Sequence, residues 1–379
     1  MHKVYRYRLY PTKTQETSMK RTLEFCRYVY NETLAMRKHA WEQEKKTLSN
    51  FDMHNLLPAW KAQRPELKAV HSQVLQEVQE RVDLAFKTFF RRVKRGGEKK
   101  AGYPRFKGKE RYDSFTYPQS GFKLDTDNNI LTLSKIGEVK IELHRRVGGA
   151  VKVKRVNINR RPTGKWFACF IVDHEPKKQP FKDGAVVGID VGLSSFATLS
   201  NGEKIENPRF FKQEEKELAK AQRKLSAQER GTPERTRAKK VVARVHERIA
   251  NRRSDFAHQL SRRIVDRFGV IASEDLNIKG MMHNGHLAKS IGDVAWRQFT
   301  NYTKNKAEEA GSIVVMVNPN NTSQQCSRCG SVVKKELKDR THSCSCGLIM
   351  DRDENAAINI LRRGLASIGD RTLEAPCES

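Results

Sequence analysis

Acidic residues are scarce in this sequence relative to basic ones, and no apolar run is long enough to cross a membrane. Among 379 residues, 44 are Asp or Glu and 73 are Lys or Arg. A membrane-spanning helix needs about 20 consecutive apolar residues, and residues 1–7 lack the apolar core of a signal peptide. We therefore expect a cytosolic protein with reduced thiols and no membrane partner.

Cysteine is also sparse, and its spacing divides the seven cysteines into two sets. The scattered ones are interpreted as packing or incidental residues: Cys26, Cys169 and Cys377. The others form two close pairs, each followed by glycine: Cys326 with Cys329, and Cys344 with Cys346. The first pair has the spacing of a zinc knuckle, and the second is one residue shorter than usual.

This clustering predicts one structural Zn²⁺ that closes a ribbon too short to have its own core. For the second pair, the alternative is that His342 replaces one of the two thiols. For the whole set, the alternative is four unrelated buried thiols. The glycines after both pairs and the basic residues between them favour the metal site.

The excess of basic residues gives a net charge of +29, spread along the whole chain. A compact fold with this charge repels itself unless a polyanion neutralises it, and nucleic acid is the expected polyanion rather than a membrane surface. Aromatic and basic residues are interleaved over residues 87–109, which suits stacking on bases and pairing with phosphates. We expect nucleic acid contacts there from Arg91, Arg92, Arg95, Tyr103, Arg105 and Lys107. The alternative is an ordinary solvated helix face.

The first half of the chain has the pattern of a small sheet interrupted by helices. Residues 4–10 alternate apolar and basic, as one strand does, and residues 14–45 and 70–93 carry apolar residues at helical spacing. Residues 115–172 contain short alternating runs punctuated by Gly and Pro, which predicts an antiparallel sheet or small barrel. The first strand could join this sheet, and residues 175–180 are typical of a linker.

The second half has a different order of elements. Two apolar runs around Asp190 predict a hairpin, and a third strand follows near residues 204–206. Then come a helical region, a strand, a helix, a strand and a final helix, over residues 212–268, 269–273, 296–310, 312–317 and 353–365. One predicted stripe of the helical region contains Val241, Val245, Ile249, Phe256, Leu260 and Ile264. This order is that of the ribonuclease-H-like fold.

Three acids occupy defined places in this order. Asp190 lies in the first strand, Glu274 at the end of the fourth and Asp353 at the start of the last helix. A carboxylate in an apolar strand is costly to bury unless its charge is compensated, and adjacent strands lie about 5 Å apart, so the three acids could converge. Two bridging Mg²⁺ ions would then support phosphodiester hydrolysis. The alternatives are that Asp190 caps the hairpin turn and that Asp353 or Asp351 caps the helix.

Short motifs along the chain agree with one known family. They are RLYPT at 8–12, GYPRFK at 102–107, GIDVG at 188–192, SEDL at 273–276, SQQCSRCG at 323–330 and DRDENAA at 351–357. In this order they resemble the TnpB family, the RNA-guided nucleases that insertion sequences encode and that are similar to type V CRISPR effectors. The shortened second cysteine pair departs from the family pattern and affects only the zinc assignment.

The resemblance implies a multidomain α/β and β fold. Its expected parts are a wedge β-barrel (1–10 and 105–180), a helical recognition domain (11–104), a RuvC-like, ribonuclease-H-like nuclease domain (181–320 and 348–379) and an inserted zinc ribbon that binds target nucleic acid (321–347). The resemblance also implies a guide RNA from the transposon end, a double-stranded DNA target beside a short motif, and the cytosol or nucleoid of a prokaryote.

In the family pattern, the catalytic acids match Asp190, Glu274 and Asp353. Asp353 is preferred to Asp351 because the family places the ligand just before the x-Asn-Ala-Ala segment. Gln76 matches a position that the family uses to read the adjacent DNA motif.

The expected function is therefore RNA-guided DNA cleavage with two catalytic Mg²⁺ ions. One alternative is a non-cleaving, RNA-guided DNA-binding regulator, but such relatives have lost catalytic acids that this chain retains. The other is a transposase that joins DNA ends through the same acids, since fold does not fix function. The RNA-binding character of the first half argues against the transposase.

Overall fold

The computed structural model describes most of the chain, which divides into two compact units, Met1–Glu175 and Pro176–Ser379. The described residues are 2–96, 101–109, 111–145, 153–173, 185–283, 285, 287–336 and 339–372. The predicted linker at 175–180 and Cys377 lie outside these ranges. No helix in the described part of the chain is both long and apolar enough to span a bilayer.

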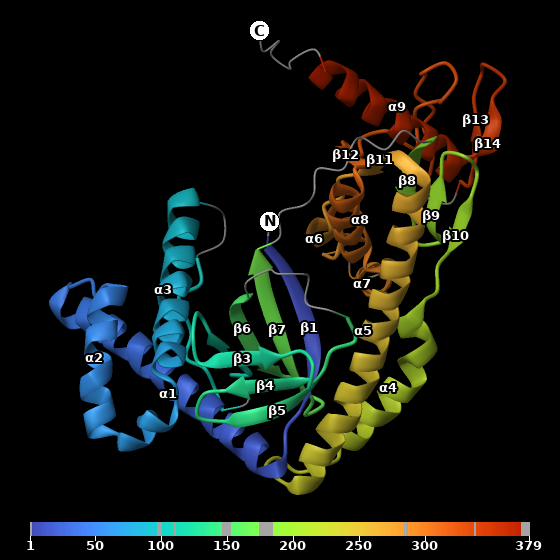
Figure 1. Ribbon diagram of the computed structural model, residues 1–379. Coiled ribbons are helices and arrows are strands. Elements are labelled where there is room, and N and C mark those ends of the chain that lie inside the picture. The colour runs from blue at the N-terminus through green and yellow to red at the C-terminus, as the bar shows by residue number, and fades with distance from the viewer. Residues whose placement is uncertain are drawn as a thin grey trace. The chain divides into compact units, whose positions relative to one another are not determined.

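The first unit is built on a seven-stranded antiparallel sheet in the order β2-β6-β7-β1-β5-β4-β3. Strand β1 (His2–Tyr10) pairs with β7 on one side and β5 on the other, which confirms that the first strand joins the sheet. In Figure 1, β3, β4 and β5 run across the direction of β6, β7 and β1, so the sheet is strongly curved. The other strands are β2 (Ser114–Tyr117), β3 (Phe122–Asp125), β4 (Ile130–Leu133), β5 (Gly137–Glu142), β6 (Val153–Arg160) and β7 (Trp166–Asp173).

Helices α1 (Lys13–Glu44), α2 (Asn50–Gln63) and α3 (Ser72–Arg95), with the short 3₁₀ helix η1 (Pro65–Ala69), complete the first unit. Capping boxes at Thr12 and Ser49 fix the starts of α1 and α2, because each side chain accepts a hydrogen bond from the third helical N–H. Cys26 is fully buried in α1, in agreement with its interpretation as a packing residue. The apolar stripe of α3 is buried as far as Phe86, and basic residues dominate its last turn.

The second unit contains a five-stranded sheet in the order β10-β9-β8-β11-β12. Strands β8 (Ala185–Val191), β9 (Ser195–Leu199) and β10 (Lys204–Glu206) are antiparallel neighbours, and the predicted hairpin places Asp190 opposite Thr198. Strand β11 (Phe268–Glu274) runs parallel to both β8 and β12 (Ile313–Val317). The predicted order of these five strands along the chain is therefore observed.

Helices cover both faces of this sheet. Their bounds are α4 (Phe210–Ser226), α5 (Pro233–Arg267), α6 (Ile278–Met281), α7 (Ala288–Val294), α8 (Trp296–Ala310) and α9 (Arg352–Thr372). On one face, Val187 and Ile189 of β8 pack in a core with Leu260 of α5. A small two-stranded sheet, β13 (Thr341–Ser343) and β14 (Ile349–Asp351), precedes α9. The predicted apolar stripe of α5 is wrong at Val241, which is 45% exposed, because Val242 packs in its place on the cluster that contains Val245 and Ile249.

Helix α9 lies directly on the opposite face of the sheet, and two glycines permit the close approach. A Cβ atom on Gly188 of β8 would lie 2.0 Å from the carbonyl oxygen of Ala357, and one on Gly364 would lie 2.5 Å from the Cβ of Ala272. Ala357 and Ile360 are fully buried in the contact. Any side chain at Gly188 would push α9 off the sheet, so this glycine sets how closely α9 packs on β8 at Ala357 and Leu361.

Candidate active site and metal centre

The register between β8 and β11 places Asp190 beside Glu274. Gly188 pairs with Ala272 across these parallel strands, and side chains two residues apart point to the same face of a sheet. Because Gly188 and Ala272 both contact α9, Asp190 and Glu274 also face α9, at neighbouring strand ends. The predicted convergence of these two acids follows from the pairing of the strands.

The start of α9 separates the roles of its two aspartates. Asp351 Oδ1 accepts hydrogen bonds from the backbone N–H groups of Asp353 and Glu354 at 2.9 and 3.2 Å, and Asp351 Oδ2 pairs with Lys204 Nζ at 2.6 Å. Asp351 is thus the residue that caps α9. The Asp353 carboxylate is left for another role, and its Oδ1 accepts two hydrogen bonds from the guanidinium of Arg352, at 3.0 and 2.9 Å.

Asp190 lies within electrostatic reach of both other acids. Burial raises the pKa of Asp190 well above its usual value, and the negative charges of Glu274 and Asp353 raise it further. Burial also raises the pKa of Glu274, although a hydrogen bond from Thr322 opposes the shift. Of the three, Glu274 is buried and Asp190 and Asp353 are half-buried. A bound cation relieves the repulsion between neighbouring carboxylates, and oxygen ligands suit Mg²⁺.

A cleft of about 300 Å³ opens beside Glu274, between the end of β11 and helix α8. Three basic side chains contribute to its lining: Lys279, Arg297 and Lys304. Basic groups around an acidic centre suit a nucleic acid substrate, because they can hold the backbone phosphates that flank the reacting one. Sequence reasoning did not identify this cleft, since its residues come from β11, α6 and α8.

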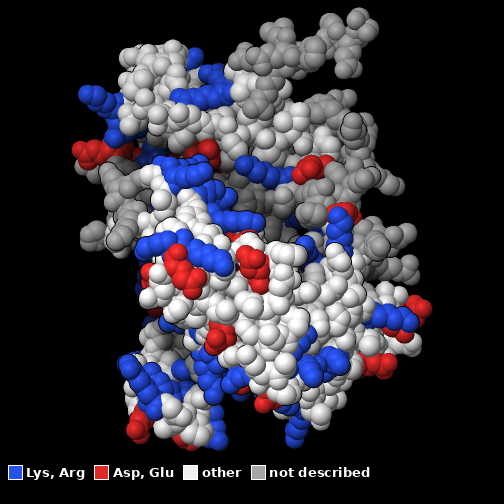
Figure 2. All heavy atoms as spheres, turned by 90° about the vertical axis from the view of Figure 1, so that its left-hand side faces the viewer, with Lys and Arg blue, Asp and Glu red and all other residues white. Residues whose placement is uncertain are grey.

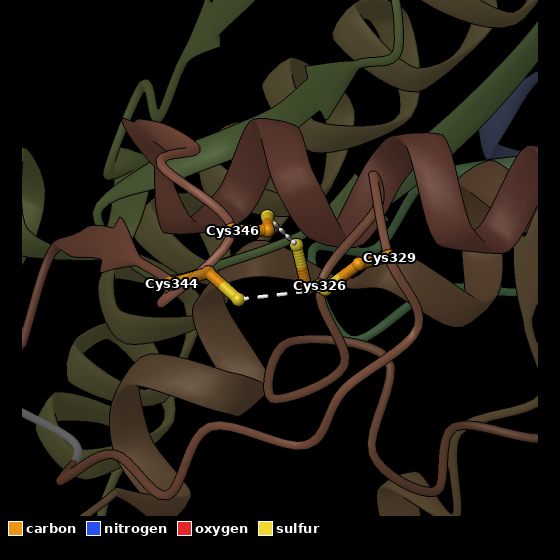
Figure 3. A group of neighbouring side chains, drawn as sticks. All are labelled: Cys326, Cys329, Cys344 and Cys346. Carbon is orange, nitrogen blue, oxygen red and sulfur yellow. Dashed lines mark hydrogen bonds between the residues drawn. The ribbon is translucent and has the colours of Figure 1, made fainter.

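The four clustered cysteines converge in space (Figure 3). Their Sγ atoms all lie within 4.8 Å of one another, with Cys326 and Cys346 at 3.7 Å and Cys329 and Cys344 at 3.6 Å. A tetrahedral Zn²⁺ with bonds of about 2.3 Å requires sulfur atoms about 3.8 Å apart. Within the described ranges, these cysteines are the one group of three or more His, Cys, Asp or Glu side chains whose ligand atoms already lie close enough together to hold a metal ion. The residues therefore fit a metal.

The surroundings of the Cys329 thiol favour metal binding. Contacts with the side chain and backbone of Ser331 lower the pKa of the Cys329 thiol to about 6, and the thiolate is the form that binds metal. The shortened second pair supplies both Cys344 and Cys346 to the group. His342 is not part of it, since its buried ring directs Nδ1 at Lys335 Nζ.

The expected nucleic acid residues of the first unit lie around the end of α3. Arg91, Arg92 and Arg95 are exposed and make no hydrogen bond or ion pair with any residue in the described ranges. Tyr103 packs edge-on against Phe86 and Phe89, with ring centroids 5.5 and 5.3 Å apart. On the face shown in Figure 2, Lys and Arg side chains clearly outnumber Asp and Glu.

The other two predicted contacts of the 101–109 loop differ in exposure. Arg105 is exposed, whereas Lys107 is half-buried and its backbone is fixed by Asn31, which both donates to and accepts from it at 3.1 and 2.8 Å. Gln76, in the first half of α3, is half-buried, and its carbonyl oxygen meets His54 Nε2 at 3.2 Å. The loop is therefore anchored to α1 and presents Tyr103 and Arg105 outward.

Three family models match consecutive parts of the chain. Residues 169–285 match the OrfB_IS605 model, described as a probable transposase, and residues 296–360 match the Cas12f1-like TNB domain. Residues 1–46 match a model described as a helix-turn-helix domain of the same OrfB_IS605 type. In this structure, those residues form strand β1 and one continuous helix, α1.

Known proteins resemble the chain over nearly its whole length. A Streptomyces pristinaespiralis protein named "Putative RNA-guided DNA endonuclease" is 36% identical over 96% of this chain and 90% of its own length. The Escherichia coli protein "Putative RNA-guided DNA endonuclease InsQ" is 31% identical over 96% of this chain and 92% of its own. The fold is similar to that in a Cas12f1–sgRNA–target DNA complex, with a TM-score of 0.57, 14% identity, and coverage of 91% of this chain and 82% of that one.

The sheet that carries Asp190 and Glu274, the cysteine group and the matching family models define a transposon-type nuclease. The sequence identity to the two relatives extends over nearly the whole chain and makes the assignment more specific. The chain belongs to the TnpB family of RNA-guided DNA endonucleases.

Proposed function

We propose that this chain uses a bound guide RNA to select double-stranded DNA and hydrolyses a phosphodiester of that DNA at Asp190, Glu274 and Asp353. The observation that carries the proposal is the register of β8 and β11, which sets Asp190 and Glu274 side by side under the start of α9. The basic cleft beside Glu274 supports the same reading, because it offers phosphate-binding groups next to the acids.

The acids and the cysteines would hold different metals. The carboxylates of Asp190, Glu274 and Asp353 would hold two Mg²⁺ ions, which when bound activate water and stabilise the leaving oxygen. The four thiols would hold one Zn²⁺, which serves structure. The chain itself supplies the cap at Asp351, which leaves Asp353 available, and the close packing of α9 that sets the position of Asp353.

Domain roles follow from the resemblance and are part of the proposal. Residues 1–10 and 105–180 form the wedge, and residues 11–104 form the recognition helices. Residues 181–320 and 348–379 form the RuvC-like, ribonuclease-H-like nuclease domain, whose strand order supports the assignment. Residues 321–347 form the zinc ribbon, which contacts target nucleic acid. The guide RNA comes from the transposon end, and the site of action is the cytosol or nucleoid of a prokaryote.

The proposed function is tested by expressing the chain together with its flanking transposon-end DNA. We expect one discrete RNA to co-purify and plasmid cleavage to require both that RNA and Mg²⁺. RNA-dependent DNA binding without cleavage would instead indicate the regulator. Joining of DNA ends without any RNA requirement would indicate the transposase. Sequencing the bound RNA then gives the guide, from which a cleavable target can be designed.

The exposed arginines at the end of α3 give a second prediction. Replacing Arg91, Arg92 and Arg95 by Gln should reduce the salt dependence of guide RNA binding. Each single-strand phosphate contact contributes about 0.7 to the slope of log affinity against log salt, so three lost contacts should lower the slope by about 2. Filter binding at three salt concentrations measures it, and the catalytic acids should be unaffected.

The matched control removes the same charge from residues that already have acidic partners. Lys38, Arg237 and Arg262 lie 3.6, 3.6 and 3.5 Å from carboxylate oxygens of Glu42, Glu234 and Asp266. Their triple Gln variant should keep nearly the wild-type slope. Equal slopes for both triple variants would remove the end of α3 from the nucleic acid surface.

A further inference from the structure

A buried threonine, four residues before the first clustered cysteine, contacts Glu274. Thr322 is 4% exposed, and its Oγ1 donates to Glu274 Oε1 at 2.5 Å. That length is typical of an O–H···O⁻ bond to an ionised carboxylate. The carbonyl oxygen of Pro319 is the other acceptor within reach, at 3.1 Å, and a hydroxyl has only one proton to donate. The shorter contact assigns that proton to Glu274.

Thr322 is itself held in place by helix α9. Asn359 Nδ2 donates to the carbonyl oxygens of Thr322 and Gln325 at 2.9 and 2.6 Å. Asn355 donates to Gln325 O at 2.8 Å and accepts from the Ser327 N–H at 2.9 Å. Asn355 belongs to the DRDENAA motif that contains Asp353, and Asn359 lies one turn further along α9. The nuclease assignment gave neither amide a role.

The same segment continues directly into the metal-binding group. Gln325 and Ser327 flank Cys326, so the amides of α9 fix the backbone on both sides of this ligand. Arg363, also on α9, donates to the carbonyl oxygens of Asn318 and Asn320 at 3.0 and 2.6 Å. Residues 318–327 therefore form one fixed backbone path, with the Glu274 contact in its middle and a cysteine ligand at its end.

We propose that Thr322 is a positioning residue that orients the Glu274 carboxylate, and that the metal-bound cysteine group acts on the nuclease site through this residue. The inference rests on the proposed function, because it takes Glu274 as a catalytic metal ligand. Groups that hydrogen-bond a ligating carboxylate fix its orientation, and losing one typically costs 10–100-fold in metal affinity or activity. The cysteine ribbon thus has a role inside the nuclease site in addition to contact with nucleic acid.

The test measures Mn²⁺ binding to the carboxylate site by electron paramagnetic resonance. The protein used has zinc in its cysteine group. Thr322→Val keeps the side-chain shape and removes the hydroxyl, so the apparent Mn²⁺ affinity should fall about 10–100-fold. The Mg²⁺ concentration needed for half-maximal cleavage should rise in the same proportion. Thr322→Ser restores the hydroxyl and should bind Mn²⁺ like the wild type.

The matched control is Thr303→Val. Thr303 is equally buried in α8 of the same unit, but its Oγ1 donates to the carbonyl oxygen of Phe299 at 3.0 Å, and it has no hydrogen bond to an acid among the described residues. This variant should lose similar stability and keep wild-type Mn²⁺ affinity. Should the Thr322→Val protein fail to fold, Asn359→Leu breaks the same path from α9 and is expected to weaken Mn²⁺ binding as well.

The outcomes separate this inference from the proposed function. If Glu274→Gln loses the ion but Thr322→Val binds Mn²⁺ with wild-type affinity, the role of Thr322 is overturned. If Thr322→Val does not fold, wild-type affinity in Asn359→Leu has the same meaning. Retention of Mn²⁺ binding and cleavage by Glu274→Gln and by Asp190→Asn would instead overturn the assignment of the acids. If Thr322→Val and Thr303→Val both lose Mn²⁺ affinity, the loss is explained by general destabilisation, and the inference is also overturned.

Discussion

Asp190→Asn should abolish guided DNA cleavage and make the metal-free protein more stable. Its half-buried carboxylate lies near Glu274 and Asp353, so it is central to the proposed metal site. Losing a metal-bridging carboxylate removes several kcal/mol of transition-state stabilisation, and about 1.4 kcal/mol corresponds to each factor of ten, so cleavage should fall roughly a thousandfold or more. Guided DNA binding should remain near wild type in a gel-shift assay, because the substitution removes a proposed metal ligand and leaves the basic residues that contact nucleic acid unchanged.

The gain in stability follows from the sign of the pKa shift. Burial and the neighbouring acids raise the pKa of Asp190 in the folded state above its unfolded value of 3.8. The folded state is therefore favoured below pH 3.8, and this advantage is lost as the pH rises through the folded pKa. Asparagine cannot ionise, so the variant should melt at a higher temperature than the wild type at pH 7. Each kcal/mol gained in the free energy of unfolding should raise the melting temperature by about 2–4 °C. The difference between the two proteins should shrink toward pH 4.

Asp351→Asn is the matched control for both measurements. The asparagine keeps a cap for α9 and loses only the ion pair with Lys204, so its cleavage should stay within about tenfold of wild type. Its melting temperature should not rise, because the ion pair with Lys204 helps to lower the pKa of Asp351, whereas burial raises the pKa of Asp190. Cleavage by Asp190→Asn at the wild-type rate in Mg²⁺ would refute the catalytic assignment of this residue.

Sequence patterns were sufficient for the parts of the fold that depend on local periodicity. The alternating run at residues 4–10 predicted β1, the apolar runs around Asp190 predicted β8 and β9, and residues 296–310 predicted α8 with its observed ends. The order of these elements then placed Asp190 and Glu274 on neighbouring strands. The parallel register that aligns the two acids depends on hydrogen bonding across the sheet and became visible only in the structure.

Features that depend on contacts between distant residues escaped the sequence. Helix α2 was missed because Pro58 interrupts its pattern and only Met53 and Leu57 are buried. Thr322 gave no signal, since its partner Glu274 lies 48 residues away. Asn355 and Asn359 could be seen in the sequence, but their hydrogen bonds to residues 322–327 became apparent only in the structure. Local spacing predicted the cysteine pairs, whereas the choice of Cys344 over His342 required the fold.

The cysteine group should hold one zinc per chain, and Cys326→Ser with Cys329→Ser should remove it. Zinc bound to four thiols contributes roughly 10–16 kcal/mol of folding free energy in small domains, which equals or exceeds the whole stability of a typical domain. The strands that it supports, β13 and β14, have only three residues each and cannot stay folded on their own. We therefore expect the segment around them to unfold locally while the five-stranded sheet persists.

Elemental analysis of protein purified without added zinc should find about one zinc per wild-type chain and almost none in the double variant. Hydrogen exchange should become fast at the backbone amides of Cys326 and Cys344, whose N–H groups donate to Ser331 O and Leu348 O at 2.8 and 3.0 Å. Because residues 318–327 also carry the Thr322 contact, Mn²⁺ binding and cleavage should fall together with zinc content. Cys169→Ser is the control, since this thiol lies in the first unit and accepts from Asn159 at 3.3 Å, and it should keep the zinc. A double variant that retains one zinc per chain would show that other residues hold the metal.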